Sequence, residues 1–166
     1  FQYSRDIEIH NAKIDTKDSF WEVDNVTVYD SELNGEFLGW HSRGLRLVNC
    51  HISGEQPLCY AKDLVLENCT FDPECDRAFE YSTLQADIRG HIKSIKNPTS
   101  GRIVADSIGE VIIDKNIKQP ADCQILTRSD SPLYRTLLST MCNFATFSYQ
   151  KCVILPKMDI NVGFGR

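Results

Sequence analysis

Apolar residues recur along the first half of the chain at a fixed distance of 19 residues. Ile7, Val26, Leu45 and Leu64 each open the same short pattern. A second apolar residue follows each of them two positions later: Ile9, Val28, Leu47 and Leu66. Four copies in register indicate a solenoid, in which each copy obtains a core only by stacking on its neighbours. We number the columns of the repeat by the first copy, so that Ile7 opens column 7.

The spacing inside each copy predicts β-strands. Polar Glu8 lies between Ile7 and Ile9, and such alternation with a period of two is typical of a strand. Column 11 then carries residues that adopt left-handed backbone and bend the chain, namely Asn11, Asp30, Asn49 and Asn68. Apolar residues return at column 14, so we expect a second short strand, with columns 7, 9, 12 and 14 pointing inward.

Two solenoid architectures accommodate an Asn column. A leucine-rich repeat needs about 20 to 29 residues per copy, whereas a parallel β-helix stacks its coils at about 4.8 Å and turns each column into a ladder. The shorter, all-β copies favour the β-helix. We therefore predict an all-β, single-stranded parallel β-helix of about five to six coils over residues 1–116. Residues 117–166 are predicted to form a C-terminal extension, either a cap with an amphipathic helix from Leu133 to Met141 or a disordered tail.

Five segments of the chain carry motifs of one kind. They are FWEVDNVTVYDSEL (20–33), LGWHSRGLRLVNCHI (38–52), LCYAKDLVLENCTF (58–71), FEYSTLQADI (79–88) and IKNPTSGRIVADSIGEVIID (95–114). Together they resemble the C-terminal half of an uncharacterised bacterial family, a domain of unknown function. The resemblance implies a right-handed parallel β-helix of the pectin-lyase-like superfamily, and no assigned activity. Since similar proteins carry further coils before the position of Phe1, we expect this chain to lack N-terminal coils.

Composition narrows the classes of partner. The chain has 18 basic and 23 acidic residues, a net charge of −5, and its basic residues are scattered, so nucleic acid is not an expected partner. The longest apolar runs, such as 111–113 and 153–155, are too short to span a bilayer. A membrane is therefore not expected as a partner either.

Cysteine usage predicts the compartment. Seven cysteines form an odd set without compact disulfide spacing, which is typical of reduced thiols in a cytoplasmic protein. Zinc held by Cys50, His51, Cys59, Cys69 and Cys75 would lack the paired C-x-x-C spacing of strong zinc motifs. We expect buried thiols, no metal and no cofactor.

Column 3 is the richest in chemistry. It contains Tyr3, Glu22, His41, Tyr60 and, through a shared F-x-Y-S pattern, Tyr81. Facing outward, it would form an aromatic and ionisable stripe that binds sugar rings; facing inward, it would be a polar ladder. We expect the inward arrangement, because aromatic ladders commonly fill solenoid coils. If a ligand site exists, we expect it along Trp21, Glu22, Trp40, His41, Tyr60, Glu80 and Tyr81.

Two function classes follow. The first is a non-catalytic scaffold that binds a carbohydrate or a protein partner. The second, implied by the superfamily, is a polysaccharide lyase or a glycoside hydrolase, for which Glu22, His41, Glu80, Asp87 and Arg89 are the candidate residues. The chain has no adjacent Asp pair, and Arg46 and Arg89 lack grouped acids, so the scaffold is favoured. An open first coil also predicts self-association through that end, or its coverage by the C-terminal extension.

Overall fold

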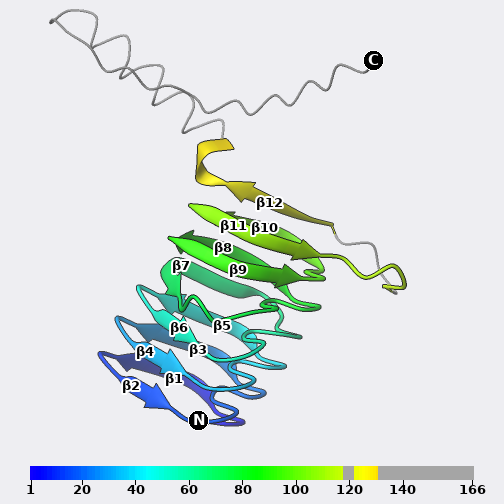
Figure 1. Cartoon of the computed structure of the whole chain (residues 1–166). Helices are drawn as coiled ribbons and strands as arrows, with labels where there is room; N and C mark the ends of the chain where they lie inside the picture. The colour runs from blue at the N-terminus through cyan, green and yellow to red at the C-terminus, as the bar shows by residue number, and fades with distance from the viewer. Residues whose placement is uncertain (118–121, 131–166) are drawn as a thin grey trace, which may run out of the picture.

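The protein is an all-β parallel β-solenoid of about six turns (Figure 1). This computed structural model describes residues 1–117 and 122–130. Val26 pairs with Ile7 in the turn before it and with Leu45 in the turn after it, so the 19-residue period is the length of one turn. All strand pairs among the described residues are parallel. The predicted fold class is confirmed.

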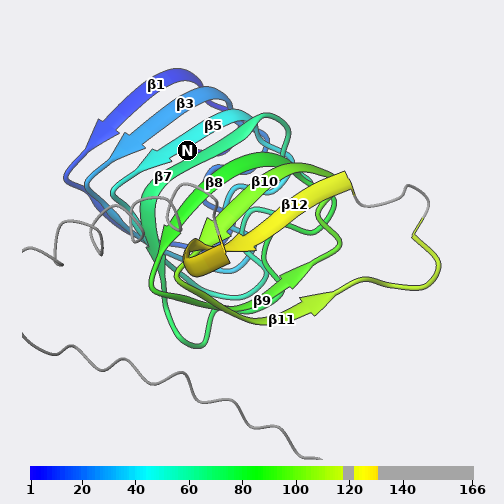
Figure 2. The ribbon, with the colours of Figure 1, turned by 90° about the horizontal axis from the view of Figure 1, so that it is seen from above.

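The first strands of successive turns lie side by side (Figure 2). They are β1 (Arg5–His10), β3 (Asp24–Tyr29), β5 (Arg43–Val48), β7 (Leu64–Phe71), β8 (Thr83–Arg89), β10 (Ser100–Ala105) and β12 (Asp122–Thr127). The second strands are β2 (Lys13–Asp15), β4 (Glu32–Asn34), β6 (His51–Ser53), β9 (His91–Lys96) and β11 (Ser107–Ile112). Because β7 continues across the bend, it pairs with both β5 and β6 and joins the two rows into one sheet, while β9 and β11 form a separate pair.

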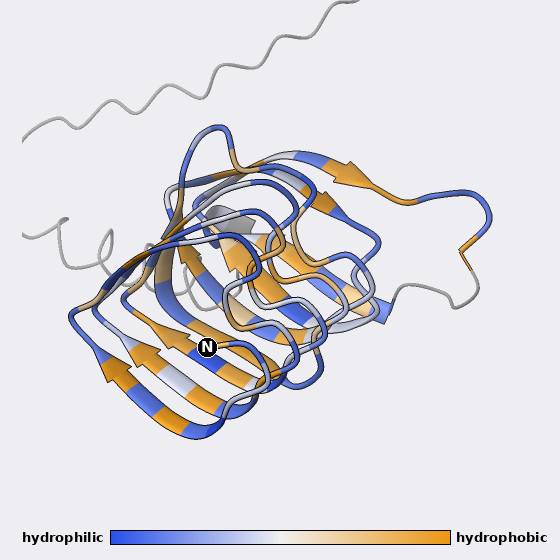
Figure 3. Ribbon diagram, turned by 90° about the horizontal axis from the view of Figure 1, so that it is seen from below, coloured by the Kyte–Doolittle hydropathy of each residue, from blue (hydrophilic) through white to orange (hydrophobic). Residues whose placement is uncertain are grey.

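The core is a set of stacked apolar columns inside the turns. Val26, Leu45 and Leu64 are buried in one line, and Leu33 and Ile52 are buried in column 14. Figure 3 shows the matching alternation of apolar and polar residues along the strands. The inward assignment of columns 7, 9, 12 and 14 is therefore confirmed for the inner turns. No helix in the part of the chain that the structure describes has the length and apolar character needed to cross a membrane.

The bend at column 11 carries a ladder of side-chain hydrogen bonds. Asn49 Nδ2 donates to Asp30 Oδ1 at 2.9 Å, and Asn68 Nδ2 donates to Asn49 Oδ1 at 2.8 Å. Arg89 Nε then donates to Asn68 Oδ1 at 2.8 Å. The ladder begins at a carboxylate and ends at a guanidinium, so both amides donate in the same direction. We call these four residues the amide ladder.

Strand β12 extends the sheet beyond residue 116, where the sequence places the end of the solenoid. It pairs in parallel with β10, and a 3-10 helix, η1 (Arg128–Asp130), follows it. Arg128 Nε donates to Asp106 Oδ1 at 2.6 Å, and its NH2 group donates to Asp87 Oδ1 at 2.7 Å. These two bonds fasten the strand to the preceding turns. The helix predicted for Leu133 to Met141 lies outside the described residues.

Candidate functional site

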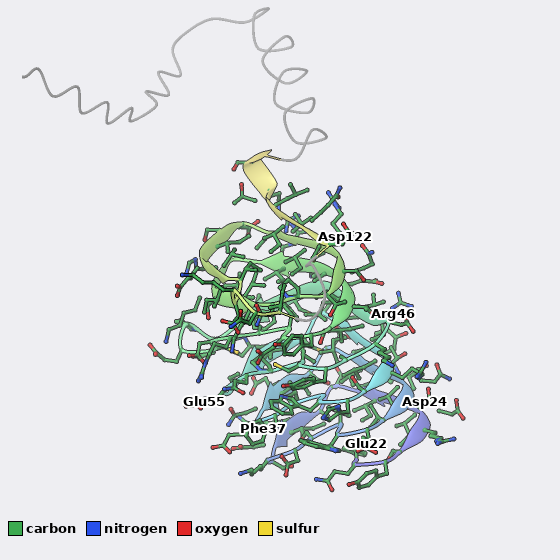
Figure 4. The ribbon with its side chains drawn as sticks, turned by 90° about the vertical axis from the view of Figure 1, so that its right-hand side faces the viewer. Glu22, Asp24, Phe37, Arg46, Glu55 and Asp122 are labelled. Carbon is green, nitrogen blue, oxygen red and sulfur yellow. The ribbon has the colours of Figure 1, made fainter. Side chains whose placement is uncertain are left out.

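Column 3 faces solvent. Tyr3 is 65% exposed and Tyr81 is 42% exposed, and Glu22 and His41 are also exposed, while Tyr60 is half-buried. The expected inward arrangement is wrong, because column 4 takes the inward position: Val23, Ser42, Ala61 and Ser82 are buried there. Figure 4 looks onto the turns that carry this column, with Glu22 and Phe37 labelled.

The backbone of column 3 is left-handed in every copy, with φ of 57° at Tyr3, 51° at Glu22, 57° at His41, 57° at Tyr60 and 55° at Tyr81. This conformation costs roughly 1–2 kcal/mol for residues other than Gly, and it favours Gly, Asn and Asp. Columns 6 and 11 have the same conformation and follow that rule, with Asp6, Asn25, Gly44 and Asp63 in column 6, whereas the left-handed positions Phe37, Gln56 and Arg77 do not follow it. The demands of the turn therefore do not explain the residue types of column 3.

The rings of column 3 and of the preceding position form a continuous series of stacked, tilted and edge-to-face contacts. Trp21 stacks on Trp40 with centroids 5.7 Å apart, His41 stacks on Tyr60 at 4.9 Å, and Tyr60 lies 5.5 Å from Tyr81. We call these five residues the aromatic column. In the two stacked pairs, Trp21 with Trp40 and His41 with Tyr60, one face of each ring covers its neighbour, whereas Tyr60 and Tyr81 are tilted by 35°. The turns thus bring together the aromatic side chains that the sequence places along this stripe.

Glu80 does not share this exposure. Its carboxylate is nearly buried and forms an ion pair with Lys96 Nζ at 3.0 Å, and Asn97 Nδ2 donates to it at 3.3 Å. The hydrogen bond between Lys96 and Glu80 raises the pKa of Lys96. Burial, with the nearby charge of Glu80, raises the pKa of Tyr60. Glu80 thus belongs to a network beneath the C-terminal end of the aromatic column.

The other acid and base candidates lie elsewhere. Asp87 and Arg89 are in β8, where Asp87 accepts a hydrogen bond from Arg128 and Arg89 bonds Asn68. Glu22, by contrast, is in a turn and accepts a hydrogen bond from Trp21 Nε1 at 3.2 Å. The structure therefore does not bring the candidate catalytic residues into one cluster. Within residues 1–117 and 122–130, no group of three or more His, Cys, Asp or Glu side chains is placed to hold a metal ion.

Two hollows lie along the second strands and the bends before them, outside the stripe along which a ligand site was expected. The larger has a volume of about 370 Å³ and is lined by Asp30, Ser31, Glu32, Asn49, Cys50, His51, Asn68 and Thr70. The smaller has a volume of about 200 Å³ and is lined by Lys13, Ile14, Asp15, Glu32, Leu33, Asn34, His51 and Ser53. Glu32 and His51 line both. We call these the polar hollows.

Hydrogen bonds between turns fix the walls of the polar hollows. Three residues of the amide ladder, Asp30, Asn49 and Asn68, line the larger one. A second ladder lines the smaller: Asn34 Nδ2 donates to Asp15 Oδ1 and Ser53 Oγ donates to Asn34 Oδ1, both at 2.9 Å. His51 Nδ1 is hydrogen-bonded to Thr70 Oγ1 at 2.8 Å. The periodic sequence contains these residues, but the volume between them depends on side-chain conformations that it does not specify.

The thiol of Cys50 lies at the floor of the larger hollow and is buried. The neighbouring Cys69 thiol lowers the pKa of Cys50, and the Cys50 thiol, together with burial, raises the pKa of Cys69. Burial raises the pKa of Cys59 and of Cys75 to about 12. All the described cysteines, including the half-buried Cys123, are free thiols.

Comparison with protein families gives one match, to DUF3737, which is described as a protein of unknown function, over residues 1–126. Comparison with curated proteins and with solved structures gave no match. The matched segment includes every strand up to β11 and most of β12. The placement in the pectin-lyase-like superfamily stays a prediction.

Proposed function

This chain belongs to the DUF3737 family, and we propose that it is a non-catalytic scaffold that binds a protein partner along the aromatic column. One observation carries the proposal: exposed Tyr and His side chains occupy left-handed backbone positions that favour Gly or Asn. A residue type that opposes a local preference, without burial to compensate, is typical of functional positions. Tyr and Trp are also the residues that dominate the binding energy of protein interfaces.

A protein fits the aromatic column better than a carbohydrate does. A sugar binds an aromatic ring by packing its C–H groups against the electron-rich open face. Here His41 stacks on Tyr60 and Trp21 stacks on Trp40, so these faces are engaged inside the column. Ring edges and hydroxyl groups remain, and these suit the mixed polar and apolar contacts of a protein interface.

Acid–base catalysis lacks support at this site. A general acid or base works best when its pKa lies near the working pH. Beside the aromatic column, the pKa of Tyr60 and the pKa of Lys96 are both raised from values that already lie well above neutrality. Among the residues that the structure describes, no specific observation favours the lyase or hydrolase alternative.

Affinity capture with matched variants tests this proposal. The immobilised chain is incubated with a lysate of the cells that produce it, and captured proteins are purified and titrated directly. The double variant His41→Ala/Tyr81→Ala should lose the captured partner, because it removes two exposed rings of the column. Tyr29→Ala is the control, since Tyr29 stacks on His10 at 4.7 Å on β1 and β3, outside the column.

Either of two results would contradict the proposal. One is a partner whose affinity is unchanged by Trp40→Ala and by His41→Ala in folded protein, which would make the column structural. The other is a partner that is lost equally with Tyr29→Ala, which would place the interface elsewhere.

Two expectations from the sequence stay predictions. One is a cytoplasmic location. The other is self-association through the first turn, where β1 pairs with β3 on one side, and β3 is its only strand neighbour among the described residues. Sedimentation at several concentrations would test it, and a constant monomeric mass would contradict it.

A further inference from the structure

We propose that the polar hollows form a second binding site, which takes a short neutral oligosaccharide laid across β4 and β6. The site lies on the second strands, apart from the turns that carry the aromatic column, so the proposal goes beyond the proposed function and does not depend on it. The larger hollow is an open depression of about 370 Å³, a shape that suits an extended ligand lying across the surface. The smaller hollow adjoins it through Glu32 and His51.

The ladders leave hydrogen-bonding groups in fixed positions at the edge of each hollow. An Asn side chain has two N–H donors and an oxygen with two lone pairs. In the ladders, Asn34 and Asn49 each use one N–H and one lone pair on neighbouring turns. Each therefore keeps one donor and one acceptor. Because the ladder holds the amide plane, a ligand binds without the cost of ordering these side chains.

Hydroxyl groups match this arrangement. A hydroxyl donates one hydrogen bond and accepts others, so it can use the free N–H of Asn49 and a carboxylate oxygen of Asp30 together. A hydrogen bond to a carboxylate is roughly twice as strong as one between neutral groups. A sugar carries several hydroxyl groups at fixed spacing, so it can form hydrogen bonds to several residues of the ladders at once. The apolar floor is largely buried, with Leu33 at 1% exposure, so an apolar ligand would gain little.

The charge of the site selects against acidic ligands. Three carboxylates, of Asp15, Asp30 and Glu32, line the hollows, against one ammonium group, that of Lys13. Lys13 Nζ is already paired with Glu32 at 3.1 Å. These carboxylates would repel a negatively charged ligand, so we expect the bound sugar to be neutral.

Nuclear magnetic resonance titration of the whole chain tests the site. The probes are cellopentaose, chitopentaose, xylopentaose, maltopentaose and laminaripentaose at up to about 10 mM, with pentagalacturonate as the acidic counterpart. At least one neutral probe should shift the backbone amide signals around Glu32 and His51. Pentagalacturonate should leave them in place.

Variants with matched controls locate the binding. His51→Ala should weaken the binding of the neutral probe by about tenfold or more. His91→Ala is the control, because His91 is hydrogen-bonded to Ser107 at 2.9 Å in the same way as His51 to Thr70, but outside the hollows. If His51→Ala fails to fold, Glu32→Gln replaces it.

The control for Glu32→Gln is Glu36→Gln, since Glu36 forms an ion pair with Lys17 at 3.0 Å outside the hollows. Three results would overturn the proposal: no neutral probe shifts these signals, both variants of a matched pair weaken binding equally, or pentagalacturonate binds as well as the neutral probes. Shifts confined to the aromatic column would also overturn it, and would replace the protein partner proposed for that column with a carbohydrate.

Discussion

The aromatic column and the amide ladder occupy equivalent backbone in one molecule, yet they use opposite residue types. The column 3 residues of the aromatic column and the Asn and Asp residues of the amide ladder each recur once per turn with left-handed φ, for example 57° at His41 and 54° at Asn49. The ladder uses Asn and Asp, which suit this backbone and bond the next turn. The column uses Tyr and His, which do not suit it. The ladder thus stabilises the solenoid, whereas the column keeps its rings at some cost in stability.

The strongest perturbation removes the core that supports both regions. Leu47 is fully buried in β5, so Leu47→Ala should lower the free energy of unfolding by about 2–5 kcal/mol through lost burial and a cavity. Thr27→Ala, on the outward side of β3, should change it by less than about 0.5 kcal/mol. Denaturant unfolding measures both. Equal effects would contradict the inward assignment of column 9.

A smaller effect is expected when the ladder alone is broken. Asn49→Gly keeps a residue that adopts left-handed backbone but removes two side-chain hydrogen bonds, each contributing about 0.5–1.5 kcal/mol. The free energy of unfolding should therefore fall by about 1–3 kcal/mol. Asn11→Gly is the control and should have less effect, because Asn11 has the same left-handed backbone in the first turn, outside the amide ladder. A loss for Asn49→Gly no larger than that of the control would show that the ladder contributes nothing.

The weakest expected effect is local and depends on pH. The hydrogen bond from Arg128 holds the pKa of Asp106 below its usual range. A carboxylate with a lowered folded pKa stabilises the fold above its unfolded pKa of about 3.9, and this contribution is lost as pH falls through the folded value. The protection of β12 amides against hydrogen exchange, relative to the intrinsic rate at each pH, should therefore fall below about pH 4 before that of β3 and β5 amides does. A uniform loss of protection in all three strands would contradict a role for this bond in holding β12 against the preceding turns.

The sequence predicts the strands and the inward columns because a period of two inside a period of 19 leaves one arrangement that buries Leu45 and Leu47. It fails at column 3, because left-handed bends at Tyr60 and Asp63 interrupt the alternation on both sides of the buried Ala61. It also misses β12. The register there changes to 22 residues, the distance from Gly101 to Cys123, which a search for 19-residue copies does not detect.

The contrast between the two regions is tested most directly by one pair of glycine variants. Tyr81 lies at the end of the aromatic column with one ring neighbour, Tyr60, and Asn49 lies inside the amide ladder. Tyr81→Gly loses one ring contact, worth about 0.5–1.5 kcal/mol, but relieves left-handed strain of similar size. Equilibrium unfolding should therefore show that Tyr81→Gly is within about 1 kcal/mol of the unmodified chain and less destabilised than Asn49→Gly. The opposite order, with Tyr81→Gly the more destabilised, would show that the aromatic column exists for stability and would contradict its assignment as a binding surface.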